Sequence, residues 1–219
     1  MPTEPKRVLD FFFPESAQAG RGELDAASHR ETWLWRMRGG ADAEIIARFR
    51  EETERAARGE YDDWASQPSG RLALIVLLDQ FSRSVFRGSP RAFAQDPRAL
   101  ALSLEGLECG HYEALSEPWL KVAFTLPLGH CEGPDHLARI DRLIALREAI
   151  AASCAPNLRS IYASLAAQAR DVRKVIAAFG RHPHRNALLG RASTEAEERY
   201  LLEGRFPHHG ILNSGWSEP

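Results

Sequence analysis

The chain has 219 residues, of which 44% are hydrophobic and 26% charged, and its formal net charge is −2. This composition is typical of a globular protein, and the lack of a basic excess argues against a general nucleic-acid binder. The longest apolar run, Leu72–Leu78, is far too short to span a membrane. The three cysteines are odd in number and widely spaced, and the first ten residues lack an export signal, so a cytoplasmic protein is expected.

The first half of the chain predicts a series of helices. Apolar residues recur at helical spacing, and glycine or proline follows each recurrence. The run Leu72–Leu78 is apolar on every face, a pattern that a buried strand and a buried helix share. Leu and Ala predominate there over β-branched residues, so a central buried helix is predicted. The helices expected in this half cover about 8–13, 28–37, 42–58 and 72–83.

The second half continues the helical pattern. Asp96-Pro97 predicts a helix start, with Asp96 as the cap and Pro97 at the first helical position. Thr194 and Glu197 have the spacing of a capping box for the last helix. The helices expected cover about 96–109, 117–125, 135–152, 157–179 and 194–203, followed by an irregular tail at 205–219. Pro127 is expected to break the helical pattern after 117–125. Nothing in the composition divides the chain, so we expect one all-α domain of about nine to ten helices in antiparallel hairpins.

The first segment that could carry chemistry is Leu77–Arg83. Asp79 follows seven apolar residues and is expected to be buried near the end of its helix, where the helix dipole disfavours an anion. It therefore requires a cationic partner, and Arg83 lies four residues on, on the same face. Two interpretations stay open: a structural ion pair between helices, or a ligand site.

The second segment surrounds His130 and Glu132, just before a helix. A His beside a Glu can form an acid–base pair, but the same residues can cap neighbouring helix ends. Cys131 lies between them and is expected to be a small core residue rather than a nucleophile. The pattern supplies no second pair of close ligands, so no metal is predicted.

The third segment, Gly180–Asn186, follows a long helix and holds an unusual density of directed donors. Arg181 and Arg185 carry fork-shaped donors suited to a carboxylate or a phosphate. His184 and Asn186 lie beside them. The segment can bind an anion, or its donors can form hydrogen bonds with helix-end carbonyls and with Asp79. A metal cluster of His182 and His184 with His208 and His209 is not predicted, because no carboxylate or thiolate is spaced to complete it.

The chain resembles a bacterial family known as domain of unknown function 924, over nearly its whole length. The resemblance implies an all-α fold related to tetratricopeptide-repeat proteins, with the three candidate segments meeting in space. It implies no activity. The motifs that carry it are Val8–Phe13, 57–64, Leu72–Ile75, Leu78–Phe81, Phe86–Gly88, Pro90–Ala94, Leu126–Leu128, His130, Glu132, Phe179–Arg181, Pro183–Asn186, Leu189–Arg191 and Ser193-Thr194.

The chain also departs from that family pattern inside the candidate segments. Ser82 stands where the family usually has Pro, Gly129 where it has Glu, Cys131 where it has Ser, Val172 where it has His, and His182 where it has Phe. These departures raise the question whether an activity of the family is kept, altered or lost in this chain.

Two hypotheses follow from these residues. In the first, a polar pocket binds a small anionic molecule. Arg83, Arg181, Arg185 and Asn186 hold the anion, His130 or His184 serves as the acid–base residue of an enzyme, and Asp79 and Glu132 orient them. In the second, the protein is a scaffold that binds a peptide in a groove, and the polar motifs are structural. The first requires Arg181, His184 and Arg185 to be partly exposed; the second requires them to be buried and mutually bonded. No cofactor is predicted.

Overall fold

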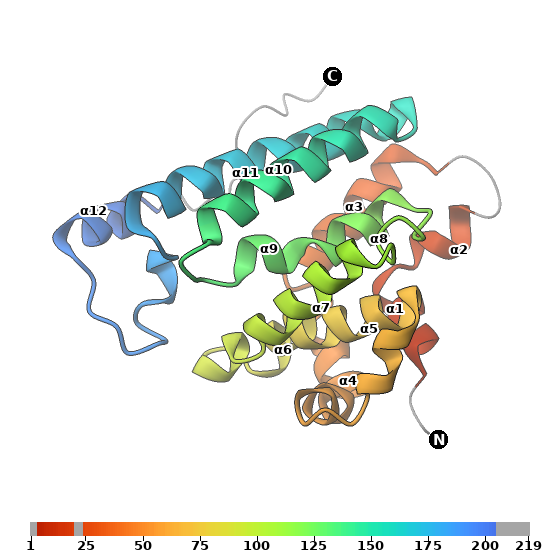
Figure 1. Ribbon diagram of the computed structural model, residues 1–219, viewed down its shortest axis with the longest axis horizontal. Coiled ribbons are helices and arrows are strands. Elements are labelled where there is room, and N and C mark those ends of the chain that lie inside the picture. The colour runs from red at the N-terminus through yellow and green to blue at the C-terminus, as the bar shows by residue number, and fades with distance from the viewer. Residues whose placement is uncertain (1–3, 20–23, 205–219) are drawn as a thin grey trace. The chain divides into compact units, whose positions relative to one another are not determined.

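The computed structural model describes residues 4–19 and 24–204, and helices dominate it (Figure 1). Within these residues there is no β-strand, and nine α-helices have seven residues or more. This confirms the predicted all-α class and the expected number of helices. No helix in the described part of the chain is long and apolar enough to cross a bilayer.

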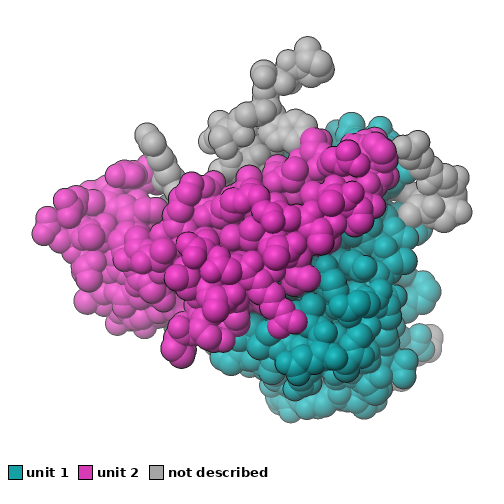
Figure 2. Space-filling model, turned by 45° about the horizontal axis from the view of Figure 1, so that its top comes forward, with its two compact units in different colours: residues 1–127 teal, residues 128–219 magenta. Residues whose placement is uncertain are grey.

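The chain groups into two compact units, residues 1–127 and 128–219, coloured separately in Figure 2. The single domain expected from the sequence stays a prediction. The division falls within the short helix α9 (Leu126–His130). The predicted irregular tail, 205–219, lies outside the described residues.

Unit 1 is built around a central helical segment. Its helices are α1 (Pro5–Phe12), α2 (Glu15–Ala19), α3 (Ala26–Met37), α4 (Asp42–Ala57), α5 (Pro68–Ile75), α6 (Ser82–Val85), α7 (Asp96–Glu108) and α8 (Pro118–Phe124). The 3₁₀ turns η1 (Asp62–Ser66) and η3 (Pro90–Phe93) lie between them. Helix α5 contacts α1, α7 and α8, and its side chains from Leu72 to Ile75 are fully buried. The predicted central buried helix is therefore confirmed.

The central helix contains one local change of geometry. Between α5 and α6 the chain forms a π-helical turn, η2 (Val76–Phe81), which packs against α4 and α7. The hydroxyl of Ser82 donates to the carbonyl of Leu77, five residues earlier, at 3.3 Å. Periodicity predicted an uninterrupted helix here, because a single wide turn changes the spacing of apolar residues too little to be detected.

Unit 1 also buries a charged cluster that the sequence pattern did not indicate. Arg36 on α3 donates to the carbonyl of Phe12 at 2.7 Å and to the carboxylate of Glu15 on α2. Burial, with a smaller contribution from the charge of Arg36, lowers the pKa of the neighbouring His29 to about 4. The cluster ties α2 to α3; helix α2 itself was not predicted, since five residues are too few for periodicity.

Unit 2 is dominated by a helical hairpin. Helices α10 (His136–Ser153) and α11 (Arg159–Phe179) pack side by side, joined by the 3₁₀ turn η4 (Pro156–Leu158) (Figure 1). Exposed pairs cross between them from Asp141 to Arg173 and from Glu148 to Arg170, which is the register of antiparallel helices. Ile140, Val172 and Ile176 form the buried core of the hairpin. Helix α12 (Glu195–Glu203) contacts the 3₁₀ turn η5 (Pro183–Arg185).

Two predicted helix boundaries need correction. The cap of α7 is Gln95, and Asp96 is the first helical residue. The carboxylate of Asp96 accepts hydrogen bonds from Arg83. Pro127 does not begin a loop but stands in the first turn of α9, where its missing N–H costs no intrahelical bond. The capping box of Thr194 and Glu197 is confirmed, with both reciprocal hydrogen bonds present.

Candidate functional site

Asp79 and Arg83, the candidates in unit 1, form the expected ion pair. Asp79 lies in η2 with no exposed surface, and its Oδ1 accepts a hydrogen bond from Arg83 Nη2 at 3.3 Å. The amide of Gln80 donates to the other oxygen, Oδ2. Arg83 also donates to both carboxylate oxygens of Asp96, at 3.0 and 3.2 Å, and to the carbonyl of Ala92 at 2.9 Å. Arg83 therefore bridges two buried carboxylates, and both interpretations of the Asp79–Arg83 pair, structural or ligand-binding, stay predictions.

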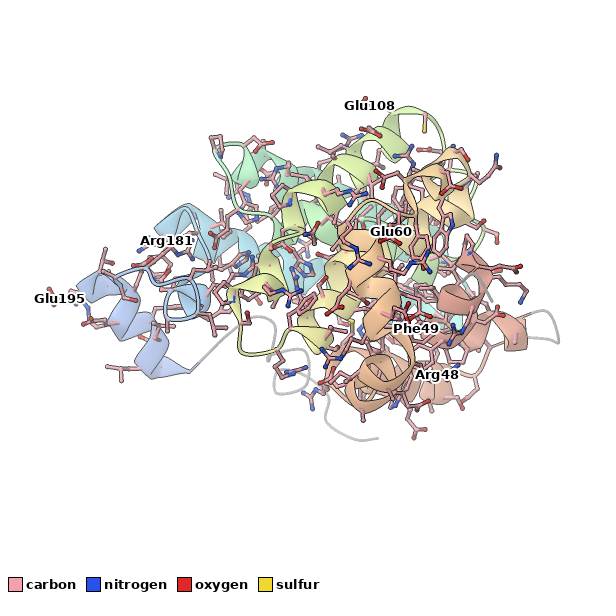
Figure 3. The ribbon with its side chains drawn as sticks, turned by 90° about the horizontal axis from the view of Figure 1, so that it is seen from below. Arg48, Phe49, Glu60, Glu108, Arg181 and Glu195 are labelled. Carbon is pink, nitrogen blue, oxygen red and sulfur yellow. The ribbon has the colours of Figure 1, made fainter. Side chains whose placement is uncertain are left out.

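In unit 2, Gly180 directs the chain out of α11. Its φ of 68° lies in the left-handed region, which glycine adopts without steric cost. The chain then forms η5, and the segment from 180 to 194 lies against residues 129–136 through a set of hydrogen bonds. Arg181, immediately after Gly180, lies at the C-terminal end of α11 (Figure 3).

Glu132 is at the centre of this network. Its carboxylate accepts the backbone N–H of His182 at 2.8 Å and two bonds from the guanidinium of Arg191. Burial works against the charged carboxylate, but these hydrogen bonds and the positive charges of Arg191 and Arg185 outweigh it and lower the pKa of Glu132. Glu132 is therefore ionised and held firmly, as an ion-pair partner requires.

Arg181 forms a second fork. Its Nε and Nη2 donate to the two oxygens of Glu197, at 2.6 and 2.7 Å, and Nη2 also reaches the carbonyl of Ala192 at 3.0 Å. The hydrogen bond from Arg181, supported by the N–H of Thr194, lowers the pKa of Glu197 to about 2 against a smaller effect of burial. The Arg181 side chain is 29% exposed.

Three histidines lie in a row beside these carboxylates. The Nε2 atoms of His136 and His182 each lie 3.0 Å from the carbonyl oxygen of Gly129. The ring centroids of His136 and His182 are 5.3 Å apart, and those of His182 and His184 are 5.4 Å apart. His136 and His182 are buried, whereas His184 is exposed.

Burial is the main reason that the pKa of His136 falls to about 4, and the charges of Arg139 and Arg185 act in the same direction. The hydrogen bond to Gly129 opposes this shift. His136 is therefore neutral near pH 7, with Nε2 as the donor to the carbonyl.

The remaining candidates differ in exposure. Arg185 is buried, with 4% of its surface exposed, so it does not have the exposure that the anion hypothesis requires of it; its charge influences both Glu132 and His136. Asn186 is buried and bonds Ser193 at 3.0 Å through its amide nitrogen. His130 is half-buried at the end of α9.

Six of the predicted residues belong to unit 2 and two to unit 1. The six are His130, Glu132, Arg181, His184, Arg185 and Asn186; the two are Asp79 and Arg83. Convergence of the two groups stays a prediction. The described residues contain no group of three or more His, Cys, Asp or Glu side chains arranged to hold a metal ion.

Sequence reasoning missed four members of the unit 2 network. Arg191 and Glu197 are the partners of Glu132 and Arg181. Glu197 belongs to the predicted capping box and Arg191 to the family motif Leu189–Arg191. Neither motif indicates which distant residue is its ion-pair partner. His136 and His182 were missed as a pair because their common acceptor is a backbone carbonyl, which leaves no mark in the sequence.

Two comparisons with known proteins give matches. The chain matches the family model described as "Bacterial protein of unknown function (DUF924)" over residues 8–205. It is similar to a solved structure of the protein of unknown function ATU0120 from Agrobacterium tumefaciens, with 32% sequence identity and a TM-score of 0.65. The match covers 91% of this chain and 97% of that one. A comparison with curated proteins found no match.

Proposed function

The chain belongs to the DUF924 family of bacterial proteins of unknown function, and we propose that it binds a small anion on unit 2. The binding surface is the face formed by the segment 180–194 together with residues 129–132. The ligand carries a carboxylate or a phosphate, because a guanidinium recognises these groups through two parallel N–H donors.

The geometry of Arg181 carries this proposal. Its Nε and Nη2 are occupied by Glu197 and Ala192, which fix the plane of the guanidinium. Nη1 donates no hydrogen bond to any residue in 4–19 or 24–204, and the side chain is partly exposed. Two N–H donors are thus held in a fixed orientation while still accessible to a ligand, and preorganised donors bind with a smaller loss of entropy.

The neighbouring charges support the same interpretation. Arg181, Arg185 and Arg191 all act electrostatically on Glu132, so three cations lie around one carboxylate in this region. The exposed imidazole of His184 belongs to the turn between Arg181 and Arg185. His184 or His130 is the predicted acid–base residue if binding is followed by chemistry.

A thermal-shift titration with inorganic phosphate and a set of small carboxylates and phosphate esters tests the proposal. At tenfold excess over Kd, a specific anion is expected to raise Tm by roughly 3–6 °C for a chain of this size. Arg181→Ala and Arg185→Ala should remove that increment, even where they change the starting Tm. Arg173→Ala is the matched control, because Arg173 lies in the same unit on α11 with its side chain 41% exposed and paired with Asp141.

Equal increments in the wild type and all three variants would mean that the anion acts without a site. The absence of any increment across the whole set would contradict the proposal directly.

The alternative function, a scaffold that binds a peptide, is favoured by a different observation. Arg191 bonds Glu132, Asn186 and the carbonyl of His182, so much of the polar motif is mutually bonded. Under that alternative, Arg181→Ala and Arg185→Ala lower stability but leave any anion-dependent increment unchanged. The same titration therefore separates the two functions.

A further inference from the structure

A groove in unit 1 lies outside every candidate segment of the sequence. It has a volume of about 590 Å³ and is lined by α1, α3 and α4. Its lining residues are Glu4, Lys6, Arg7, Asp10, Phe11, Pro14, Trp35, Glu44 and Arg48. This volume lies in the range of pockets that hold small molecules, about 300–1,000 Å³.

The apolar part of the groove is aromatic and well fixed. Phe11 and Trp35 meet edge to face, with ring centroids 5.7 Å apart. Phe11 also contacts Phe49 and Phe81, at centroid distances of 5.0 and 6.0 Å, which anchor it to the core. The Trp35 ring lies against Gly40, where an added Cβ would come within 2.7 Å of the ring carbon Cδ1. Both rings are half-buried, so each keeps a surface that a ligand can cover.

The polar part of the groove carries both signs of charge. Arg48 lies with its guanidinium 4.8 Å from the centre of the Phe11 ring and pairs with Glu44 at 3.3 Å (Figure 3 labels Arg48 on α4). Lys6 pairs with Asp10 at 2.5 Å. The four side chains are between 46% and 77% exposed. Exposed pairs of this kind contribute only about 0–1 kcal/mol, so a ligand with its own charges can replace one partner at little cost.

A further donor is present beside the charges. The indole N–H of Trp35 donates no hydrogen bond to any residue in the described part of the chain. An acceptor that reaches this N–H would displace no protein group.

We propose that this groove binds a short zwitterionic peptide with an aromatic side chain, of about two residues. The aromatic ring packs on Phe11 and Trp35. The terminal carboxylate pairs with Arg48 and accepts from the Trp35 indole, and the terminal ammonium pairs with Glu44 or Asp10. Charges of both signs around an aromatic floor match a zwitterion better than an anion or a cation alone.

The test follows the five tryptophan indole N–H signals by two-dimensional ¹H–¹⁵N NMR. Trp35→Phe assigns the Trp35 signal, and the probe is the dipeptide phenylalanyl-glycine. The Trp35 signal is expected to shift in a saturable manner. The capped, uncharged analogue N-acetyl-phenylalanyl-glycinamide should bind at least about tenfold more weakly, since it lacks both charges.

Arg48→Gln should weaken binding of phenylalanyl-glycine about tenfold. Arg50→Gln is the control, because Arg50 is exposed on the same helix and does not line the groove. Glu44→Gln provides a second variant that tests the ammonium partner. An unmoved Trp35 signal at millimolar dipeptide would overturn the proposal, as would equal binding of the free and capped peptides or equal binding by the Arg48 and Arg50 variants.

Discussion

At the level of single residues, the protonation state of His136 depends on burial and on its neighbours. Its pKa of about 4 lies below the ordinary value of 6.5, so the folded state favours the neutral imidazole. A lowered pKa means that this group stabilises the fold fully above pH 6.5, and that the contribution is lost as pH falls toward 4.

We therefore expect the His136 ring signals to be in their neutral positions at pH 6.5 and to reach the midpoint of their titration only near pH 4 in an NMR experiment. Titration of His136 near pH 6.5 in the folded protein would show that its ring is solvated.

At Gly70, the helix propensity of the residue and its packing have opposite effects on stability. In an open helix, alanine is more stable than glycine by about 1 kcal/mol. At Gly70 of α5, however, an added Cβ would lie 2.2 Å from the backbone oxygen of Trp64, which belongs to the neighbouring turn η1. The backbone cannot move aside as a flexible side chain can. The steric effect therefore outweighs the helix preference, and the substitution of Gly70 by alanine is destabilising.

Gly70→Ala is expected to lower the free energy of unfolding by about 1–3 kcal/mol, measured by urea denaturation. Ser69→Ala, at the exposed position before it, serves as the control and should change stability by less than about 0.5 kcal/mol. A more stable Gly70→Ala protein would mean that η1 does not approach α5 so closely.

At the level of elements, α12 is held by a cap and an ion pair that share one residue. Glu197 accepts the N–H of Thr194 and both donors of Arg181, so its carboxylate serves the helix start and the loop together. Its pKa falls from 4.5 to about 2. For an acid with a lowered pKa, the stabilisation is complete above the unfolded value and is lost as pH falls through the folded value.

Glu197→Gln should therefore be less stable than the wild type above pH 4.5, and the difference should shrink as pH falls toward 2. Urea denaturation of both proteins at a series of pH values measures this difference. Glu195→Gln is the comparison, because Glu195 is exposed in the same first turn. A gap that stays constant with pH would exclude the ionised carboxylate as its source.

Helix positions were largely predictable because they depend on neighbours in sequence. The limits of α1, α4 and α11 follow from Pro14, Gly59 and Gly180, residues whose backbone restrictions or freedom act within one turn. The π-helical turn at Asp79 was not predictable from the sequence. It changes the backbone hydrogen bonding, but all residues of the run before Asp79 are apolar, so the sequence shows no change of period there. The short helices α2 and α9 were missed for the related reason that five residues show no period.

At the level of the whole molecule, the candidate residues divide between the two units. Asp79 and Arg83 belong to unit 1, with Asp96 as an additional partner. The other six candidates belong to unit 2, where Arg191 and Glu197 supply partners. The proposed anion site needs only the second group, and the proposed peptide groove lies wholly in unit 1. The two proposals can therefore fail independently.

The sequence by itself determined the all-helical class, the positions of the main helices, the family, and the ion pair of Asp79 with Arg83. The family follows from motifs spread along the chain, and the others depend on local spacing or on residues within one helical turn. Only the tertiary structure decided that Arg181 pairs with Glu197, that Glu132 pairs with Arg191, and that two histidines share the carbonyl of Gly129. The reason is physical: a buried charge or imidazole must find a partner, but many distant residues can provide one, and packing selects among them.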